Sequence, residues 1–314
     1  MAAALLVVVL IAVEAPCGSV EAPCGSAAQT HPGAAPRPAL QTDMAPEPAE
    51  PGSTHELGSP PPRPELAAAE LAPAGLAAAA ATAGDALTAT TPGTTVGVAV
   101  RDRHTGETAI GSSGAVPMYA ASLVKIVVAI DVLERRRAGL PVTPQHVELI
   151  RRALGPSDDK AMNTLWARFD GPGAVARVAT QVGLTDTRAP RDPSQWGETL
   201  LSARDVVKLY DHVLSGMSAE DRELIIGALA AAPPIATDGF DQAFGLLAGA
   251  PPVASKQGWM CCLAGQIVLH STGIPGPDRR FVVALLSSQP RRVGYEGARA
   301  MLTAVTDAVR APLA

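Results

Sequence analysis

The side chains best suited to covalent chemistry in this chain are a serine and a lysine three residues apart. Ser122 and Lys125 open a mostly apolar run, 126–133, that reads as a buried helix. Residues three apart share one helix face, so the serine hydroxyl and the lysine amine can meet. An amine drawn into an apolar wall loses part of its preference for the charged form. A neutral amine can accept the hydroxyl proton, and the pattern therefore predicts a serine nucleophile.

Two further motifs supply polar groups that suit the same chemistry. A Ser-Asp-Asp sequence occupies 157–159, and a Lys-Gln-Gly sequence at 256–258 heads the C-terminal strands. Each motif alone is weak, because a serine and a lysine at this spacing occur by chance in many chains. In a plainer interpretation, Ser157 caps a helix, Lys125 extends to solvent from an ordinary helix, and Lys256 is a charge at a strand edge.

The overall composition argues against several common classes of protein. A net charge of −5 and a pI near 5.7 give no basic surface for nucleic acid. The six histidines show no metal-ligand spacing, and the sequence lacks the glycine motifs of P-loop enzymes, dinucleotide enzymes and nucleophile-elbow esterases. We therefore expect no metal, no cofactor and no nucleic-acid partner.

Residues 1–26 read as an export segment. The stretch 2–13 is apolar and of signal-peptide length, although no basic side chain precedes it. A seven-residue duplication then contributes Cys17 and Cys24, either of which would suit lipidation of an exported lipoprotein. The proline before each cysteine stands where such a site expects a small residue. We predict a protein of the cell envelope or extracellular space, anchored by lipid or free.

Residues 27–64 are rich in Pro and Ala and lack apolar periodicity, so we expect a disordered, partly extended tether. Residues 65–314 would then form the folded domain. Such a tether suits a domain held away from a membrane, and it equally suits a tail without a role beyond export. We expect a monomer whose only membrane attachment is through the N-terminal segment or its lipid.

The patterns in this domain predict an α+β fold. An Ala/Leu-rich helix is expected over 65–87, strands over 95–100 and 107–111 flank a turn, and the helix of Lys125 follows. Ser202 reads as the N-cap of a later helix.

The C-terminal end predicts three strands and a closing helix. The Lys-Gln-Gly motif starts the first strand, and strands over 265–271 and 280–287 follow. Strands from both ends of the domain should share one antiparallel sheet, flanked by the first and last helices, with a reduced helical lobe inserted between them. A cleft between sheet and lobe is the natural place for a site. The closing helix has an apolar face formed by Met301, Leu302, Val305 and Val309.

Together the three motifs resemble SxxK, SDN and KTG of the class A β-lactamase and penicillin-binding (DD-peptidase) superfamily. The resemblance spans about residues 96–309. The sequence Lys-Gln-Gly-Trp-Met-Cys-Cys at 256–262, with Ser-Asp-Asp at 157–159, is closer still to the LppW-like group of mycobacterial lipoproteins. The resemblance implies a serine hydrolase on the α/β sandwich of that superfamily.

Carried over onto this sequence, the resemblance implies a division of roles. Ser122 attacks a carbonyl and becomes acylated, with Lys125 as the base or sharing that duty. Ser157 passes a proton toward the leaving group, and Lys256 supplies positive charge for Ser157 and for a substrate carboxylate. The backbone N–H groups of Ser122 and Trp259 form the oxyanion hole, where one donor contributes about 3–4 kcal/mol.

Two residues of the implied substrate-binding side depart from the superfamily pattern. Asp159 replaces an amide that normally holds a substrate carbonyl, and an ionised acid there favours a charged Lys125, which is a weaker base. Gln257, next to Gly258, replaces a small hydroxyl that usually contacts a substrate carboxylate. Glutamine is bulkier than that hydroxyl, although its amide can still donate.

The expected deacylating base is missing. No glutamate lies between 165 and 196, and Glu198 aligns beyond the loop that normally holds one. Asp192, in that loop, is the candidate to replace the missing base. Asn163 is expected to tie the lobe to this loop. The Ser122-to-Ser157 spacing of 35 residues is also shorter than in those enzymes, which implies a trimmed lobe.

Cys261 and Cys262 are adjacent and leave two alternatives open. In an oxidising envelope they can close a vicinal disulfide, or they can sit in the core as small apolar residues.

We therefore predict an exported serine hydrolase that forms an acyl-enzyme at Ser122 with β-lactam or D-alanyl peptide substrates and releases it slowly, with activity weak or lost. The alternative is a non-catalytic envelope lipoprotein that binds wall fragments on a degenerate fold. Asp159, Gln257 and the missing glutamate favour this alternative. An amidase or esterase of another substrate class is the third candidate.

Overall fold

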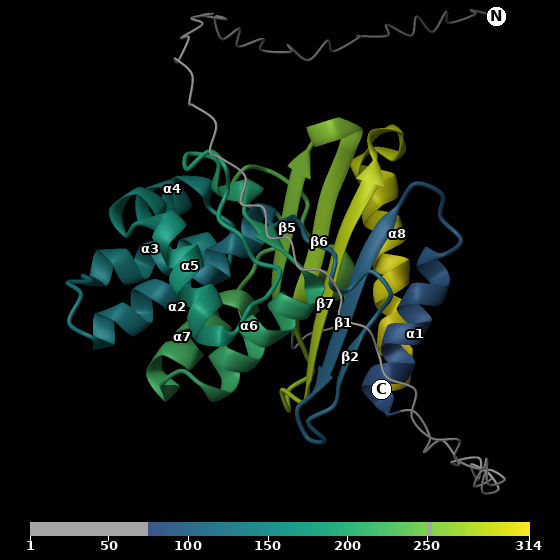
Figure 1. Cartoon of the computed structure of the whole chain (residues 1–314), viewed down its shortest axis with the longest axis horizontal. Helices are drawn as coiled ribbons and strands as arrows, with labels where there is room; N and C mark the ends of the chain where they lie inside the picture. Colours follow the sequence, from purple (N-terminus) through teal and green to yellow (C-terminus); the bar gives the residue numbers. More distant parts are fainter. Residues whose placement is uncertain (1–74, 250–252) are drawn as a thin grey trace, which may run out of the picture. The chain divides into compact units, whose positions relative to one another are not determined.

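The computed structural model describes residues 75–249 and 253–314. The predicted export segment 1–26, the tether 27–64 and the start of the predicted domain lie outside the described residues. One antiparallel sheet separates two groups of helices (Figure 1). In the part of the chain that the structure describes, no helix is both long and apolar enough to cross a bilayer.

The sheet joins strands from both ends of the domain. Its order is β2-β1-β7-β6-β5, and every neighbouring pair is antiparallel. β5 therefore forms one edge, with β6 on one side only. The strands are β1 (Thr95–Asp102), β2 (Thr108–Ile110), β5 (Val253–Cys261), β6 (Gln266–Pro275) and β7 (Phe281–Pro290), and a separate ribbon pairs β3 (Met118–Tyr119) with β4 (Leu200–Leu201).

Helices α1 (Leu76–Thr88) and α8 (Gly294–Arg310) cover one face of this sheet (Figure 1). Successive strand side chains point to opposite faces, so alternate positions supply this apolar layer. Val98, Val283 and Leu285 pack there with buried residues of α8.

The opposite face carries α6 and the helical lobe (Figure 1). α2 lies at the centre of the lobe, and its residues from Val124 to Leu133 are all buried. The helices of this side are α2 (Val124–Arg137), α3 (Pro144–Leu154), α4 (Asp159–Arg168), α5 (Gly171–Val182), α6 (Ala203–Ser215) and α7 (Ala219–Ala230). Short 3-10 helices complete the described chain: η1 (Ala121–Leu123), η2 (Trp196–Glu198), η3 (Gly245–Ala248), η4 (Leu263–Gly265), η5 (Arg291–Val293) and η6 (Ala311–Leu313).

The predicted α+β architecture is confirmed, with the sheet flanked by the first and last helices. The hydroxyl of Ser202 caps α6 as expected, accepting the N–H of Asp205 at 3.1 Å. The two last strands run further than predicted at their C-terminal ends, to Pro275 and Pro290, because β6 pairs with β5 up to Pro275 and β7 pairs with β6 up to Pro290.

A buried histidine ties the strands to the segment before Ser122. His270 of β6 is fully buried; its Nε2 lies 2.7 Å from the carbonyl oxygen of Tyr119, and its Nδ1 accepts the N–H of Ser287 at 3.2 Å. These contacts suit a neutral ring with the proton on Nε2. Burial lowers the pKa of His270 to about 4.

This histidine should make folding stability sensitive to acid. An unfolded histidine binds a proton below a pKa of about 6.5, whereas the folded one resists protonation. Its contribution is therefore complete above that pH and is lost as the pH falls toward 4, by about 3 kcal/mol in total. We expect urea unfolding to show this loss between pH 6.5 and 4 in the wild type and in the exposed-site control His104→Gln. An equal loss in His270→Asn would contradict the assignment.

Candidate active site

Ser122 lies in η1, in the turn that leads directly into α2. The preceding turn is fixed from both sides: the N–H of Ala120 donates to the carbonyl of Thr199 at 2.6 Å, and the N–H of Leu123 donates to the carbonyl of Ala120 at 2.9 Å. Ala121 adopts a left-handed φ of 45°, an uncommon conformation for a residue with a Cβ. Ser122 is 5% exposed, and its hydroxyl makes no hydrogen bond to another described residue.

Lys125 points inward rather than snorkelling to solvent. Its side chain is fully buried, and Nζ donates to the carbonyl of Ser157 at 2.7 Å, to Ser157 Oγ at 3.1 Å and to Asp159 Oδ1 at 2.6 Å. Burial lowers the pKa of Lys125, and the negative charge of Asp159 acts in the opposite direction. All three printed contacts of Nζ go to Ser157 and Asp159, so among the described residues the predicted hydrogen bond between Lys125 and the Ser122 hydroxyl is not made.

Ser157 links the two lysines. Lys256 Nζ donates to Ser157 Oγ at 2.8 Å, while Lys125 Nζ approaches the same oxygen from the helix side. The expectation that Ser157 caps the next helix is wrong, because Asp158 is the N-cap of α4 and accepts the N–H groups of Lys160 and Ala161. Ser157 itself has a left-handed φ of 58°, so its hydroxyl is directed at the lysines instead of the helix end.

Lys256 extends from the edge strand β5 and is fully enclosed. Besides Ser157, its Nζ reaches the carbonyl of Gln257 at 2.9 Å. Burial, followed by the charge of Lys125, lowers the pKa of Lys256 well below its usual value. The interpretation of this lysine as a simple strand-edge charge does not hold.

The backbone of β5 approaches the nucleophile closely at Gly258. A Cβ there would lie 3.2 Å from the carbonyl oxygen of Ala120 and 3.4 Å from the nitrogen of Ser122. As an edge strand, β5 also leaves alternate N–H groups unpaired by β6. The backbones of β5 at Gly258 and of the turn at Ser122 therefore lie in close contact.

Gln257 points away from the lysines. Its side-chain amide donates to the carbonyls of Gln242 and Phe244, and its Oε1 accepts from Ser255 Oγ. The residue is 1% exposed. Both amide hydrogens are engaged inside the protein, so this side chain has no donor left for a substrate.

Trp196 covers Lys125 from the loop 185–199. Lys125 Nζ lies 5.1 Å from the centroid of its ring, and the indole Nε1 donates to Asn163 Oδ1 at 2.7 Å. Asn163 therefore ties the lobe to this loop, as predicted. Another tryptophan, Trp166 of α4, donates to the carbonyl of Pro193 in the same loop at 2.7 Å. Sequence reasoning missed the position of Trp196, because no local pattern shows which way a loop side chain points.

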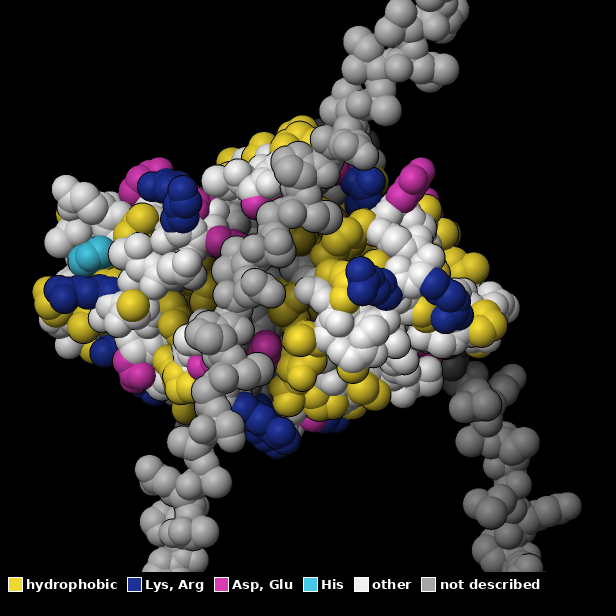
Figure 2. All heavy atoms as spheres, turned by 90° about the horizontal axis from the view of Figure 1, so that it is seen from above, with side chains coloured by type: hydrophobic (Ala, Val, Ile, Leu, Met, Phe, Trp, Pro, Cys, Tyr) yellow, Lys and Arg dark blue, Asp and Glu magenta, His cyan; other side chains and the backbone are white. Residues whose placement is uncertain are grey.

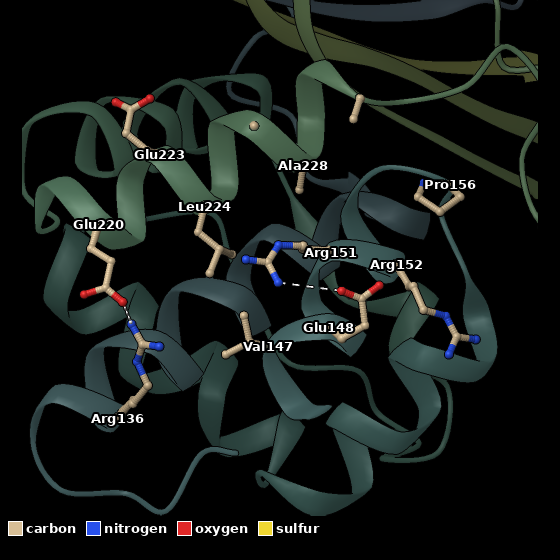
Figure 3. Close-up of a pocket in the computed structure, with 12 residues that line it drawn as sticks. Arg136, Val147, Glu148, Arg151, Arg152, Pro156, Glu220, Glu223, Leu224 and Ala228 are labelled. Atoms are coloured by element: carbon tan, nitrogen blue, oxygen red, sulfur yellow. Dashed lines mark hydrogen bonds and ion pairs between the residues drawn. The ribbon is translucent and has the colours of Figure 1, made fainter. Parts of the chain in front are cut away.

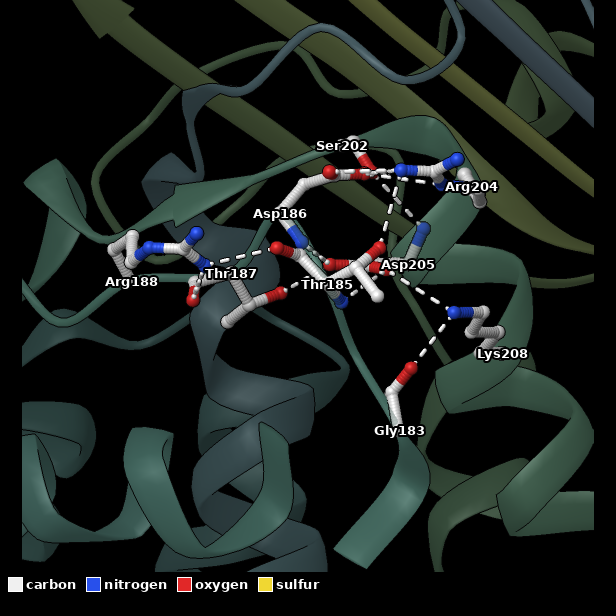
Figure 4. A network of polar contacts seen from close by, with 9 residues as sticks. All are labelled: Gly183, Thr185, Asp186, Thr187, Arg188, Ser202, Arg204, Asp205 and Lys208. Carbon is white, nitrogen blue, oxygen red and sulfur yellow. Dashed lines mark hydrogen bonds and ion pairs between the residues drawn. The ribbon is translucent and has the colours of Figure 1, made fainter. Parts of the chain in front are cut away.

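The base of this loop is held by a polar network around Asp205 of α6 (Figure 4). Its carboxylate accepts the N–H groups of Thr185 and Asp186 and the hydroxyl of Thr187, at 2.7–3.1 Å. Asp186 in turn pairs with Arg204 at 2.8 Å. The loop is thereby fixed at α6 and at α4, which holds Trp196 in place. Asp192, the substitute base considered, is exposed and accepts hydrogen bonds from its neighbour Ser194.

A cavity of about 600 Å³ lies elsewhere in the lobe, between α3 and α7 (Figure 3). It is lined by charged side chains such as Arg151 and Glu148, and none of the four candidate catalytic residues borders it. Its connection to the site is indirect: Arg152 on its wall pairs with Asp158, the residue after Ser157.

The sulfur atoms of Cys261 and Cys262 form a vicinal disulfide at the end of β5. Cys261 is exposed and Cys262 is half-buried. The alternative that both are small apolar residues of the core is wrong.

Comparison with known proteins identifies a family that matches this chain. Residues 79–147 and 138–311 match a family described as the beta-lactamase enzyme family. The lipoprotein LppW of Mycobacterium tuberculosis is 35% identical over 225 residues, which cover 69% of each chain.

Solved structures show the same fold at low identity. A β-lactamase from Chitinophaga pinensis is 16% identical, with a TM-score of 0.60 over 73% of this chain and 97% of that one. A point mutant of PBP-A, solved as an acyl-enzyme complex with penicillin G, is 17% identical, with a TM-score of 0.58 over 73% of this chain and 94% of that one.

Proposed function

Because the chain belongs to the beta-lactamase enzyme family, we propose that it is a serine hydrolase that forms an acyl-enzyme at Ser122 with β-lactam or D-alanyl peptide substrates. The observation that carries the proposal is the hydroxyl of Ser157, held by the amines of Lys125 and Lys256 at 3.1 and 2.8 Å. In this proposal these three buried groups carry the proton that Ser122 gives up.

In the proposed acylation, Ser122 Oγ attacks the substrate carbonyl and gives its proton to the neutral amine of Lys125. The new bond joins Oγ to the carbonyl carbon, and the developing oxyanion accepts the N–H groups of Ser122 and Trp259. The bond to the leaving nitrogen then breaks. Lys125 returns the proton through Ser157 to that nitrogen, with Lys256 keeping the Ser157 hydroxyl polarised.

Deacylation is proposed to be slow, for two reasons. The indole of Trp196 stands over Lys125, on the side from which the loop 185–199 would have to deliver a base and a water. Loop residue Asp192 is turned to its own neighbour Ser194. A half-time of hours, rather than seconds, is expected for the acyl-enzyme.

Persistence of the adduct is measurable. We expect protein labelled with benzylpenicillin and freed of excess drug to keep the added mass for hours at pH 7. Trp196→Gly removes the indole and admits water, so its adduct should decay about tenfold faster or more. The conservative variant Trp196→Phe keeps an aromatic ring in the loop and should retain the adduct longer than Trp196→Gly. Adduct loss within seconds in the wild type would contradict slow deacylation.

A fluorescent penicillin tests the proposed function itself. The wild type should retain the dye through denaturing electrophoresis, and Ser122→Ala should not, while both show the same thermal melting. Failure of the folded wild type to label at any drug concentration would overturn the proposal.

The alternative function, a non-catalytic binding lipoprotein, is favoured by specific contacts. Asp159 holds Lys125 at 2.6 Å, and Gln257 has both amide hydrogens engaged internally. Turnover of a chromogenic cephalosporin that is lost in Ser122→Ala would exclude it. Tight binding of wall fragments without any covalent adduct would support it.

We also propose that the protein is a monomer of the cell envelope, with 1–26 as the export segment, 27–64 as a tether and 65–314 as the domain. The similarity to the lipoprotein LppW supports this location. Mass analysis of the membrane fraction would reveal a lipid on Cys17 or Cys24, and export can be tested by fractionation of expressing cells.

A further inference from the structure

The loop before β5 places an acidic side chain beside the proposed proton path. Thr237 donates from its N–H and its hydroxyl to the carbonyl of Pro156, at 2.8 and 3.1 Å, directly before Ser157. The next residue, Asp238, accepts the indole N–H of Trp259 through Oδ2 at 3.0 Å. Asp238 is exposed. Its carboxylate is therefore anchored between the Ser157 turn and the strand of the proposed oxyanion hole.

The carboxylate of Asp238 lies next to two stacked aromatic side chains. Trp259 stacks on Phe240, with ring centroids 4.6 Å apart and an interplanar angle of 13°. Lys256 Nζ lies 5.9 Å from the Trp259 ring. Arg299, which also lies near Phe240, forms an ion pair with Asp241 at 2.5 Å. The Trp259 ring is therefore already in contact with Phe240 and Lys256, and the exposed carboxylate of Asp238 is the group open to a substrate ammonium.

The second acid of the site lies on the other side of Ser157. The side chain of Asp159 is 55% exposed, whereas that of its partner Lys125 is fully buried. Lys125 and Lys256 are buried, whereas Asp159 and Asp238 are exposed. Burial lowers the pKa of each lysine, and the negative charges of both acids act in the opposite direction.

The side chain at position 257 offers no hydrogen-bond donor to a substrate carboxylate. Gln257, at the position that the family uses for this contact, has both amide hydrogens bonded to backbone carbonyls. On the face seen in Figure 2, basic and acidic side chains are interspersed. Exposed charges act mainly within a Debye length, so the nearby carboxylates decide which leaving groups are attracted.

We propose that this site takes acyl donors whose leaving group carries an ammonium group instead of a carboxylate, and that Asp238 recognises it. This inference rests on the proposed acyl transfer to Ser122. The bond formed joins Ser122 Oγ to the acyl carbon, the bond from that carbon to the leaving atom breaks, and the serine proton ends on the leaving group.

Three thioesters with one acyl group, benzoyl-D-alanyl, test the preference. Their thiols are thiocholine, which is cationic, 3,3-dimethylbutane-1-thiol, which is its neutral isostere, and 3-mercaptopropionate, which is anionic. Each acylation releases the thiol and adds the same mass to the protein, so quenched samples give comparable rates by intact mass. Dividing each rate by that of alkaline hydrolysis removes differences in intrinsic reactivity.

We expect the normalised rate to be about tenfold higher for the thiocholine ester than for the mercaptopropionate ester, the size of one charge contact at a solvent-accessible site. Asp238→Asn keeps an acceptor for the indole and should remove most of this ratio, as should Asp238→Ser. The control Asp307→Asn, on the far helix α8, should leave the ratio unchanged.

The outcomes separate the two proposals. A faster anionic ester, or an unchanged ratio in both Asp238 variants, overturns the inference while acyl transfer stands. Acylation by benzylpenicillin but by none of the three thioesters also overturns it. If no reagent acylates Ser122, the proposed function fails and the inference fails with it.

Discussion

Replacement of Lys125 by methionine will lower the rate of penicillin acylation at Ser122 by about a thousandfold, the usual worth of a positioned general base. Methionine has nearly the same length and is at home in an apolar wall, so it fills the space without supplying an amine. The lysine contributes its Nζ to three oxygen atoms around Ser157, and the variant loses the base and this anchor together. Quenched time points with a fluorescent penicillin measure the rate.

The chain offers a matched control for this variant. Lys160 also follows a serine by three residues, but it is exposed on α4. Lys160→Met should acylate like the wild type. A Lys125→Met protein with the wild-type melting temperature and the wild-type acylation rate would show that another group removes the serine proton.

Asp159→Asn is expected to act in the opposite direction and raise the acylation rate at pH 7 by about tenfold. Burial lowers the pKa of Lys125 and the carboxylate opposes this, so removal of the carboxylate lets that pKa fall further. A larger share of the lysine is then neutral, and a nearby charge commonly moves a pKa by about 1–3 units. The low end of this range applies, since the Asp159 side chain is 55% exposed and screened by water.

The pH profile distinguishes this cause from a change in binding. The ascending limb of acylation rate against pH should move to lower pH in Asp159→Asn, because the base loses its proton earlier. A gain of activity cannot come from misfolding, which makes the result easy to interpret. An unmoved limb, or a slower variant, would show that Asp159 does not restrain Lys125.

The parts of this fold that follow from sequence are those with strong local patterns. The hairpin of β1 and β2, the apolar helix α2 and the closing helix α8 were all predictable from periodicity. The superfamily motifs then brought Lys125, Ser157 and Lys256 to one place, and the hydrogen bonds among these three residues agree. The length of β6 and β7 was not predictable, because a strand ends where its partners stop pairing.

The directions in which side chains point were harder to predict from the sequence. Ser157 and Asp158 are both good N-cap residues, and only the left-handed turn at Ser157 assigns the cap to Asp158. Gln257 can donate in either direction, and its amide turns inward because the carbonyls of Gln242 and Phe244 lie there. Asp238 lies far from all three motifs in sequence, and no local signal indicates its place beside Trp259.

The central claim, that Ser122 is the nucleophile, is tested most directly by mapping the penicilloyl group on the protein. After incubation with benzylpenicillin and digestion with trypsin, the added mass should lie on the peptide 104–125, which contains Ser122, and fragmentation should place it on that residue. Mass on peptide 153–160, which contains Ser157, or no added mass on any peptide of the folded protein, would contradict the account.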